Sequence, residues 1–201
     1  MEPFWGDDFM YRPMYGMNES HGLRSWFHNE MSTWTLAFPT VEFNQLIFIG
    51  SGVNASSTTY AVGNWEAPLG PLAPTGSRMT VRITDFYAGT EDDRIARNYM
   101  MIDMLDLLRQ RGVAPLPLSP LPQGRVSPPY GDSIPAPLAR YVIEPDADAH
   151  KAHKVVSAML NAEWMGSSID LVHWHRSDMI WYGPVPFGMA VGSAQYVEHF
   201  L

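Results

Sequence analysis

The spacing of hydrophobic positions in the first half of the chain changes from a helical to a strand-like period. Between residues 20 and 37, apolar side chains recur every three or four positions, Ser20 is a candidate N-cap, and Pro39 ends the run. This spacing predicts an amphipathic helix. A second, shorter helix is predicted over residues 104–111, where Gly112 stops it.

Between these two helices, apolar and polar residues alternate with a period of two. The alternation predicts four strands, at residues 41–49, 58–65, 79–87 and 95–103. Glycine, proline and short polar residues at 70–76 and 90–93 predict the turns that join the last three strands. A helix followed by an antiparallel meander predicts an α+β domain, in which a strongly bent sheet wraps around the helix.

Proline dominates the middle of the chain. Eight prolines lie between residues 113 and 137, and each fixes φ and lacks the N–H that helices and sheets require. We therefore interpret residues 113–146 as a linker or a surface strap, and the leucines between the prolines favour the strap. This segment divides the chain into a domain at residues 1–112 and a C-terminal block at residues 147–201.

The C-terminal block has a helical stripe of apolar residues over 147–164, a strand at 179–182 and a helix from residue 193. Like the N-terminus, it runs from an aromatic strand through a proline and a Gly-Met pair into a helix. We interpret residues 147–201 as a partial second copy, a helix–strand–helix unit. Its first helix is predicted to close the first sheet, either in the same chain or by exchange within a dimer.

Several short motifs follow one another in the first domain. They are A-F-P at 37–39, P-T-G at 74–76, V-R-I-T-D-F-Y at 81–87, R-I-A-R-N-Y-M-M-I-D at 94–103 and L-L-R-Q at 107–110. This order resembles that of the SnoaL-like polyketide cyclases of the nuclear-transport-factor-2-like superfamily. W-Y-G-P at 181–184 resembles the opening of another such domain. The chain departs from the pattern at Asp93, where the family usually has glycine, and at Arg97, where it usually has glutamate.

The resemblance implies a cone-shaped sheet whose open end holds a ligand, and dimers that form through sheet faces. It also implies acid–base chemistry without a cofactor, on a polyketide or another carbonyl compound that forms an enol. In this family the motif positions of Asp103 and Asp85 imply a base and its partner, respectively. The implied ligand is small and hydrophobic.

Strand alternation gives these two carboxyl groups a physical rationale of their own. Asp85 and Asp103 lie on neighbouring strands of the hairpin, and if both point into an apolar cavity, burial and mutual repulsion raise one pKa towards neutrality. A carboxyl group with such a pKa can transfer a proton beside a carbonyl. The candidate ligand contacts, which share those strand faces or are large aromatics, are Ile83, Tyr87, Tyr99, Met101, Trp26 and Trp65.

Two other interpretations remain open for the charged residues. Asp103 immediately precedes the helix at 104–111, where an aspartate commonly serves as the N-cap. An epoxide hydrolase of the same fold needs an arginine beside its acids on the cavity face, but Arg82 is predicted on the face opposite Asp85. We therefore place the epoxide hydrolase below the cyclase.

Composition narrows the classes of function further. The absence of cysteine excludes disulfides, thiolate metal sites and a cysteine nucleophile. A net charge of −8 with scattered lysines and arginines argues against a nucleic-acid partner. The histidine pairs at 150/153 and 173/175 lack a third ligand, so neither a metal nor a cofactor is expected. Without a leader-like N-terminus or a run of about 18 apolar residues, we expect a cytoplasmic protein that does not enter the membrane.

Three functions stay open at this stage. The first is a cyclase or isomerase that transfers protons on a small hydrophobic carbonyl compound. The second is a module that binds a hydrophobic ligand without catalysis, and the third is an interaction or vestigial fragment. A cavity into which Asp85 and Asp103 both point would favour the first.

Overall fold

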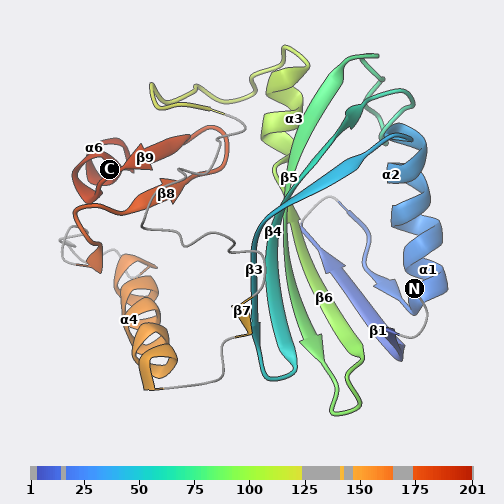
Figure 1. The fold of residues 1–201 in the computed structure, drawn as a ribbon. Coiled ribbons are helices and arrows are strands. Elements are labelled where there is room, and N and C mark those ends of the chain that lie inside the picture. The colour runs from blue at the N-terminus through green and yellow to red at the C-terminus, as the bar shows by residue number, and fades with distance from the viewer. Residues whose placement is uncertain (1–3, 15–16, 124–140, 143–146, 165–173, 201) are drawn as a thin grey trace.

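A computed structural model describes residues 4–14, 17–123, 141–142, 147–164 and 174–200. Its main feature is a curled, mixed sheet of seven strands in the order β2-β1-β6-β5-β4-β3-β7 (Figure 1). The strands are β1 (Trp5–Pro13), β2 (Ser20–His21), β3 (Glu42–Ser51), β4 (Asn54–Asn64), β5 (Arg78–Gly89), β6 (Ile95–Ile102) and β7 (Tyr141–Val142). The antiparallel meander from β3 to β6 and the α+β class are as predicted, while β1 adds to β6 in parallel.

Three consecutive helical segments cover one face of the sheet (Figure 1). They are α1 (Leu23–Trp26), the π-helical turn η2 (Phe27–Met31) and α2 (Ser32–Ala37). The sequence predicted a single helix here, and the structure adds the π-helical turn in its middle. A further helix, α3 (Met104–Gln110), follows β6 directly, and the Asp103 side chain accepts a hydrogen bond from the Asp106 amide at 3.1 Å. Asp103 is therefore the N-cap of α3.

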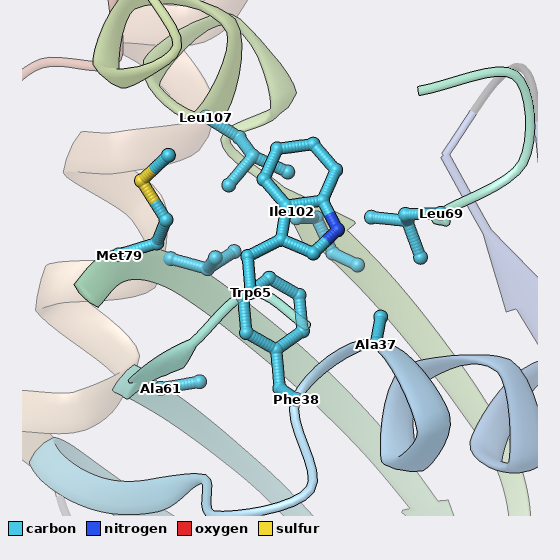
Figure 2. Packing of buried hydrophobic residues seen from close by; sticks show 9 residues of the cluster. Ala37, Phe38, Ala61, Trp65, Leu69, Met79, Ile102 and Leu107 are labelled. Atoms are coloured by element: carbon cyan, nitrogen blue, oxygen red, sulfur yellow. The ribbon is translucent and has the colours of Figure 1, made fainter. Parts of the chain in front are cut away.

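The hydrophobic core gathers around Trp65, at the end of the sheet where α3 lies. Figure 2 shows the indole ring surrounded by side chains from β4, β5, β6 and both neighbouring helices. Trp65 is fully buried, its ring stacks on Phe38 at 5.9 Å, and its Nε1 donates to the Ala67 carbonyl at 2.7 Å. The other buried members are Ala37, Ala61, Leu69, Met79, Val81, Ile102 and Leu107.

The described part of the proline-rich segment lies against the C-terminal block. The Ser119 amide donates to the Pro186 carbonyl at 3.0 Å, and the Met189 amide donates to the Pro122 carbonyl at 2.9 Å. Leu121 is buried between them, against Ala190 and Tyr196. Most of the predicted linker, at residues 124–140 and 143–146, lies outside the described residues, so the division of the chain at this segment stays a prediction.

The C-terminal block contains α4 (Ala147–Trp164), β8 (Ile180–Tyr182), β9 (Met189–Val191) and α6 (Ser193–Phe200). The sequence missed β9, which pairs with β8 to form a two-stranded antiparallel sheet. This small sheet and α6 lie on the opposite side of the main sheet from α1 and α2 (Figure 1). None of the described helices has the length and apolar character needed to cross a bilayer.

Candidate functional site

A cavity of about 290 Å³ lies between the concave face of the main sheet and the helical segments α1, η2 and α2. Its walls are mostly aromatic and aliphatic, and five polar side chains from the strands and the helical segments interrupt them. The aromatic and aliphatic lining includes Trp5, Trp26, Trp34, Phe38, Phe43, Val81, Ile83, Met100 and Ile102. The five polar residues are Glu30, Thr35, Asp85, Tyr87 and Asn98.

Asp85 is the carboxyl group that β5 contributes to the cavity. Its side chain is buried, and Asn98 Nδ2 on β6 donates a hydrogen bond to Asp85 Oδ1 at 3.0 Å. Tyr87, two residues further along the same strand face, is a second hydrogen-bond partner. Burial raises the pKa of Asp85, and the hydrogen bonds from Asn98 and Tyr87 oppose that rise.

Glu30 is a second carboxyl group in the same cavity, supplied by the π-helical turn η2. It is 7% exposed, and Trp34 Nε1 donates to its Oε1 at 2.6 Å. The Tyr11 hydroxyl, from β1, is its other hydrogen-bond partner. Burial raises the pKa of Glu30, while the hydrogen bonds from Trp34 and Tyr11 lower it. The two cavity carboxyl groups thus have similar surroundings, each with one tyrosine and one N–H donor.

Tyr11 connects these two groups electrostatically. Its side chain is fully buried and its hydroxyl contacts the Met100 sulfur at 3.5 Å. The pKa of Tyr11 is raised by burial and then by the negative charges of both Glu30 and Asp85. Because such interactions weaken with distance, both carboxyl groups lie near this hydroxyl. The cavity therefore combines a mostly apolar lining with two carboxyl groups that lie near the same hydroxyl.

Asp103 does not share this cavity, so the expectation that it faces Asp85 is wrong. Its Oδ2 accepts from Arg82 Nη2 at 3.0 Å and from the Val185 amide at 3.1 Å, on the outer face of the sheet. The prediction that Arg82 lies opposite Asp85 is confirmed. Asp103 therefore belongs to a buried ion pair and a helix cap, which was the alternative interpretation from its sequence position.

A β-bulge in the β5–β6 hairpin explains this difference. Ile95 pairs with Gly89 but Arg97 pairs with Ala88, so β6 advances two residues against one of β5. The extra residue changes which side chains of β6 share a face with Asp85, because side chains alternate along a strand. Asp85 consequently pairs with Met100, and the inward residues of β6 are Asn98, Met100 and Ile102.

The six candidate ligand contacts divide in the same way. Ile83, Tyr87 and Trp26 line the cavity. Tyr99 and Met101 lie on the outer face, where they are 40% and 54% exposed, because the bulge turns them away. Trp65 belongs to the core and does not line the cavity.

Among the cavity residues that the sequence analysis missed, Glu30 and Asn98 are the two that contribute a carboxyl group and its hydrogen-bond donor. For Glu30 a signal exists, because Trp26, Glu30 and Trp34 recur at intervals of four residues and so share one helical face. A single carboxylate between two tryptophans on an apolar face is unusual, since charged groups are rarely buried without partners. Asn98 carries no comparable signal, since its orientation depends on the bulge.

The described ranges contain no group of three histidine, aspartate or glutamate side chains with the geometry of a metal site. His173, one of the paired histidines considered above, lies outside those ranges. The cavity offers a ligand two carboxyl groups, a tyrosine, an asparagine, a threonine, and aromatic and aliphatic walls.

The sequence matches a family model described as SnoaL-like polyketide cyclase over residues 1–111. No curated protein matches the chain. Several solved structures are similar to this chain. One is a provisionally assigned SnoaL-like polyketide cyclase from Jannaschia sp. CCS1, which is 13% identical in sequence. The match covers 58% of this chain and 77% of that one, with a TM-score of 0.49. IdmH from Streptomyces antibioticus has 17% identity, coverage of 55% and 84%, and a TM-score of 0.48. AclR from Streptomyces galilaeus has 15% identity, coverage of 55% and 79%, and a TM-score of 0.47. At these identities and TM-scores, the three structures carry no argument about substrate or mechanism.

Proposed function

Because the chain belongs to the SnoaL-like polyketide cyclase family, we propose that it is a cyclase or isomerase that transfers protons on a small hydrophobic carbonyl compound. The proposal gives Asp85 the role of the base and requires no cofactor. The observation that carries it is a buried carboxyl group in a largely aromatic cavity, which accepts a hydrogen bond from Asn98 at 3.0 Å. Asp103 has no part in the proposed reaction.

The environment of Asp85 suits a proton acceptor. Burial raises its pKa, which makes the carboxylate a stronger base than an exposed aspartate, while Asn98 and Tyr87 keep a fraction of it ionised. The carboxylate removes a proton from the carbon next to the carbonyl, and the resulting enol or enolate can be protonated again or can attack a second carbonyl. The apolar walls limit competing water.

The shape and lining of the cavity support a hydrophobic substrate. Trp5, Trp26 and Trp34 offer flat apolar surfaces, and only a few polar side chains interrupt the lining. Pockets of this kind bind a ligand by its apolar body and orient it through a few polar contacts. The homodimer and the cytoplasmic location that the sequence predicts stay predictions.

Proton exchange in D₂O tests the proposed function without knowledge of the natural substrate. We expect the protein to accelerate loss of the proton next to the carbonyl in some members of a panel of hydrophobic ketones, as followed by ¹H NMR. Binding of the same ketones is measured in parallel by tryptophan fluorescence, since three tryptophans line the cavity. Binding without exchange across the panel supports the non-catalytic binding module instead, and neither binding nor exchange counts against both.

A further inference from the structure

Glu30 is a buried carboxyl group in the cavity wall, and hydrophobic packing does not explain why a charged residue type stands there. A carboxyl group placed in an apolar interior costs free energy unless partners compensate it, and an apolar side chain at this position would avoid that cost. Here two partners from different elements compensate it: Trp34 on α2 and Tyr11 on β1. The arrangement therefore holds one carboxyl group in a fixed position on the cavity wall.

The backbone around Glu30 is also specialised. Residues Phe27–Met31 form a π-helical turn between two α-helical segments. Such turns insert one additional residue into a helix, are rare, and are often found at functional sites. Within this turn Glu30 is the only buried residue, and it reaches the same cavity as Asp85.

We propose that Glu30 is the proton donor of the site and acts on the carbonyl oxygen while Asp85 removes the proton from the neighbouring carbon. This inference rests on the proposed function above. Tyr11 and Trp34 are positioning residues, because they contact Glu30 and not the reacting carbonyl. Two carboxyl groups of opposite protonation state then serve one reaction, an arrangement known to divide acid and base roles.

The step is balanced without any added reactant. The C–H bond next to the carbonyl breaks and its proton forms an O–H bond with the Asp85 carboxylate. The carbonyl oxygen takes the proton of the Glu30 carboxylic acid, so that the product is a neutral enol and Glu30 becomes a carboxylate. Asp85 then gives its proton to a carbon of the enol, a different one in an isomerisation, and the enol O–H returns its proton to Glu30, so that the carbonyl and both carboxyl groups are restored.

The test compares Glu30→Gln with wild type by the rate of proton exchange as a function of pH. The wild-type rate is expected to fall at low pH, where Asp85 becomes protonated, and at high pH, where Glu30 loses its proton. Glu30→Gln keeps the size and the hydrogen-bond acceptor of the side chain. We expect it to lower the maximal rate about 100-fold and to remove the high-pH decline.

Tyr11→Phe is the second variant, and a purely structural role for Glu30 would not produce its expected effect. The Tyr11 hydrogen bond lowers the pKa of Glu30, so its removal should move the high-pH decline to higher pH without abolishing it. If Glu30→Gln retains the wild-type rate and both limbs of the profile, the donor role is wrong while the role of Asp85 stands. If the wild type shows no exchange on any ketone, the donor role and the proposed function both fail.

A separate observation concerns the C-terminal block. Residues 179–181 and 190–196 repeat the backbone pairing of residues 9–11 and 20–26 at a constant distance of 170 positions along the chain. The Gly22 amide donates to the Phe9 carbonyl at 2.6 Å, and the Gly192 amide donates to the Met179 carbonyl at 2.7 Å. Both glycines have left-handed backbones, with φ of 77° and 83°.

The strand pairing repeats with the same spacing. Tyr11 pairs with Ser20 in the N-terminal hairpin, and Trp181 pairs with Ala190 in the C-terminal one. At these positions the polar groups of the first hairpin are replaced by an indole and a methyl group. The C-terminal hairpin thus has the backbone geometry of the N-terminal one without its hydroxyl groups.

We infer that residues 179–196 are a second copy of the N-terminal hairpin that has kept its fold and serves to dock on the outer face of the first sheet. Arg82 is the anchor, since its guanidinium donates to the Tyr182 carbonyl at 2.9 Å and to the Gly183 carbonyl at 3.0 Å. Its ion pair with Asp103, which accepts from the Val185 amide, completes the contact. The function of Asp103 is therefore attachment of this unit.

Backbone hydrogen exchange in the full chain tests the docking. Arg82→Met should accelerate amide exchange in residues 179–192 about 100-fold, since loss of one partner of a buried ion pair weakens such a contact strongly. Arg78→Met is the matched control, because Arg78 lies on the same strand face but its ion pair with Glu42 is exposed. Protection in β1 reports that the first domain remains folded. Unchanged exchange of residues 179–192 in Arg82→Met overturns the proposal.

Discussion

Replacement of Asp85 by asparagine is expected to lower the rate of proton exchange roughly 10³- to 10⁴-fold, the upper range for loss of a general base. The change preserves the size of the side chain and its acceptor oxygen, so Asn98 can still donate to it. Only the ability to take up a proton is lost. Ligand affinity should change little, because the aromatic walls are untouched.

The same substitution is expected to leave stability unchanged or to increase it. Burial raises the pKa of Asp85 in the folded protein above its unfolded value. The folded state therefore loses stability as the pH rises through the folded pKa, where the buried group must become charged. Asparagine remains neutral, so the variant avoids this loss at neutral pH. Urea unfolding of wild type and variant at pH 7 measures the difference.

Asp103→Asn is the matched control for this experiment. It makes the same chemical change just after the neighbouring strand β6, on the outer face of the sheet, where Asp103 contacts Arg82 and caps α3. We expect it to retain the exchange activity within a factor of a few, because it touches no cavity residue. Loss of activity in Asp103→Asn with retention in Asp85→Asn would contradict the proposed site and restore the assignment made from the motif.

Trp65→Ala is expected to lower the free energy of unfolding by about 3–5 kcal/mol, the usual cost of deleting a large buried aromatic side chain. Trp65 is fully buried, stacks on Phe38 and lies 6.0 Å from the Arg111 guanidinium carbon. Removal of the indole leaves a cavity between the sheet and α3. We expect this cavity to stay partly empty, because the sheet and the helix are held in place by their other contacts. Denaturation in urea, followed by far-UV circular dichroism, measures the loss.

Phe43→Ala serves as the comparison for Trp65→Ala. Phe43 is 62% exposed, so its removal should change the free energy of unfolding by less than about 1 kcal/mol. Because Phe43 lines the cavity, this variant should instead weaken binding of hydrophobic ketones. If Trp65→Ala leaves stability intact but abolishes binding, the sequence-based placement of Trp65 in the ligand site would be correct after all.

The period of hydrophobic positions was sufficient to predict the helices and the meander. Alternation at 79–87 placed Ile83, Asp85 and Tyr87 on one face, and all three line the cavity. Such local patterns are informative because each side chain's direction depends on its own strand. Strand β1 was missed as part of the main sheet because its partner, β6, lies far away in the sequence.

Relations between strands could not be predicted in the same way. Whether Met100 or Tyr99 lies opposite Asp85 depends on one extra residue in the hairpin, and the sequence pattern of β6 does not disclose it. Asp93, whose φ is 59°, lies in the turn that precedes this bulge. Glu30 was also missed because its role depends on a contact between distant elements. The helical period shows that Trp26, Glu30 and Trp34 share one face, but it does not show that this face lines a cavity.

Ala96 is the extra residue of the β-bulge in the β5–β6 hairpin, and its position affects how the cavity can change in evolution. Removal of Ala96, with the Gly89–Ile95 pairing kept, would exchange the two faces of β6, so that Tyr99 and Met101 would enter the cavity and Asn98 would leave it. Insertions or deletions of two residues would leave the faces as they are. Loss of this one bulge residue would therefore give the same scaffold a chemically different interior.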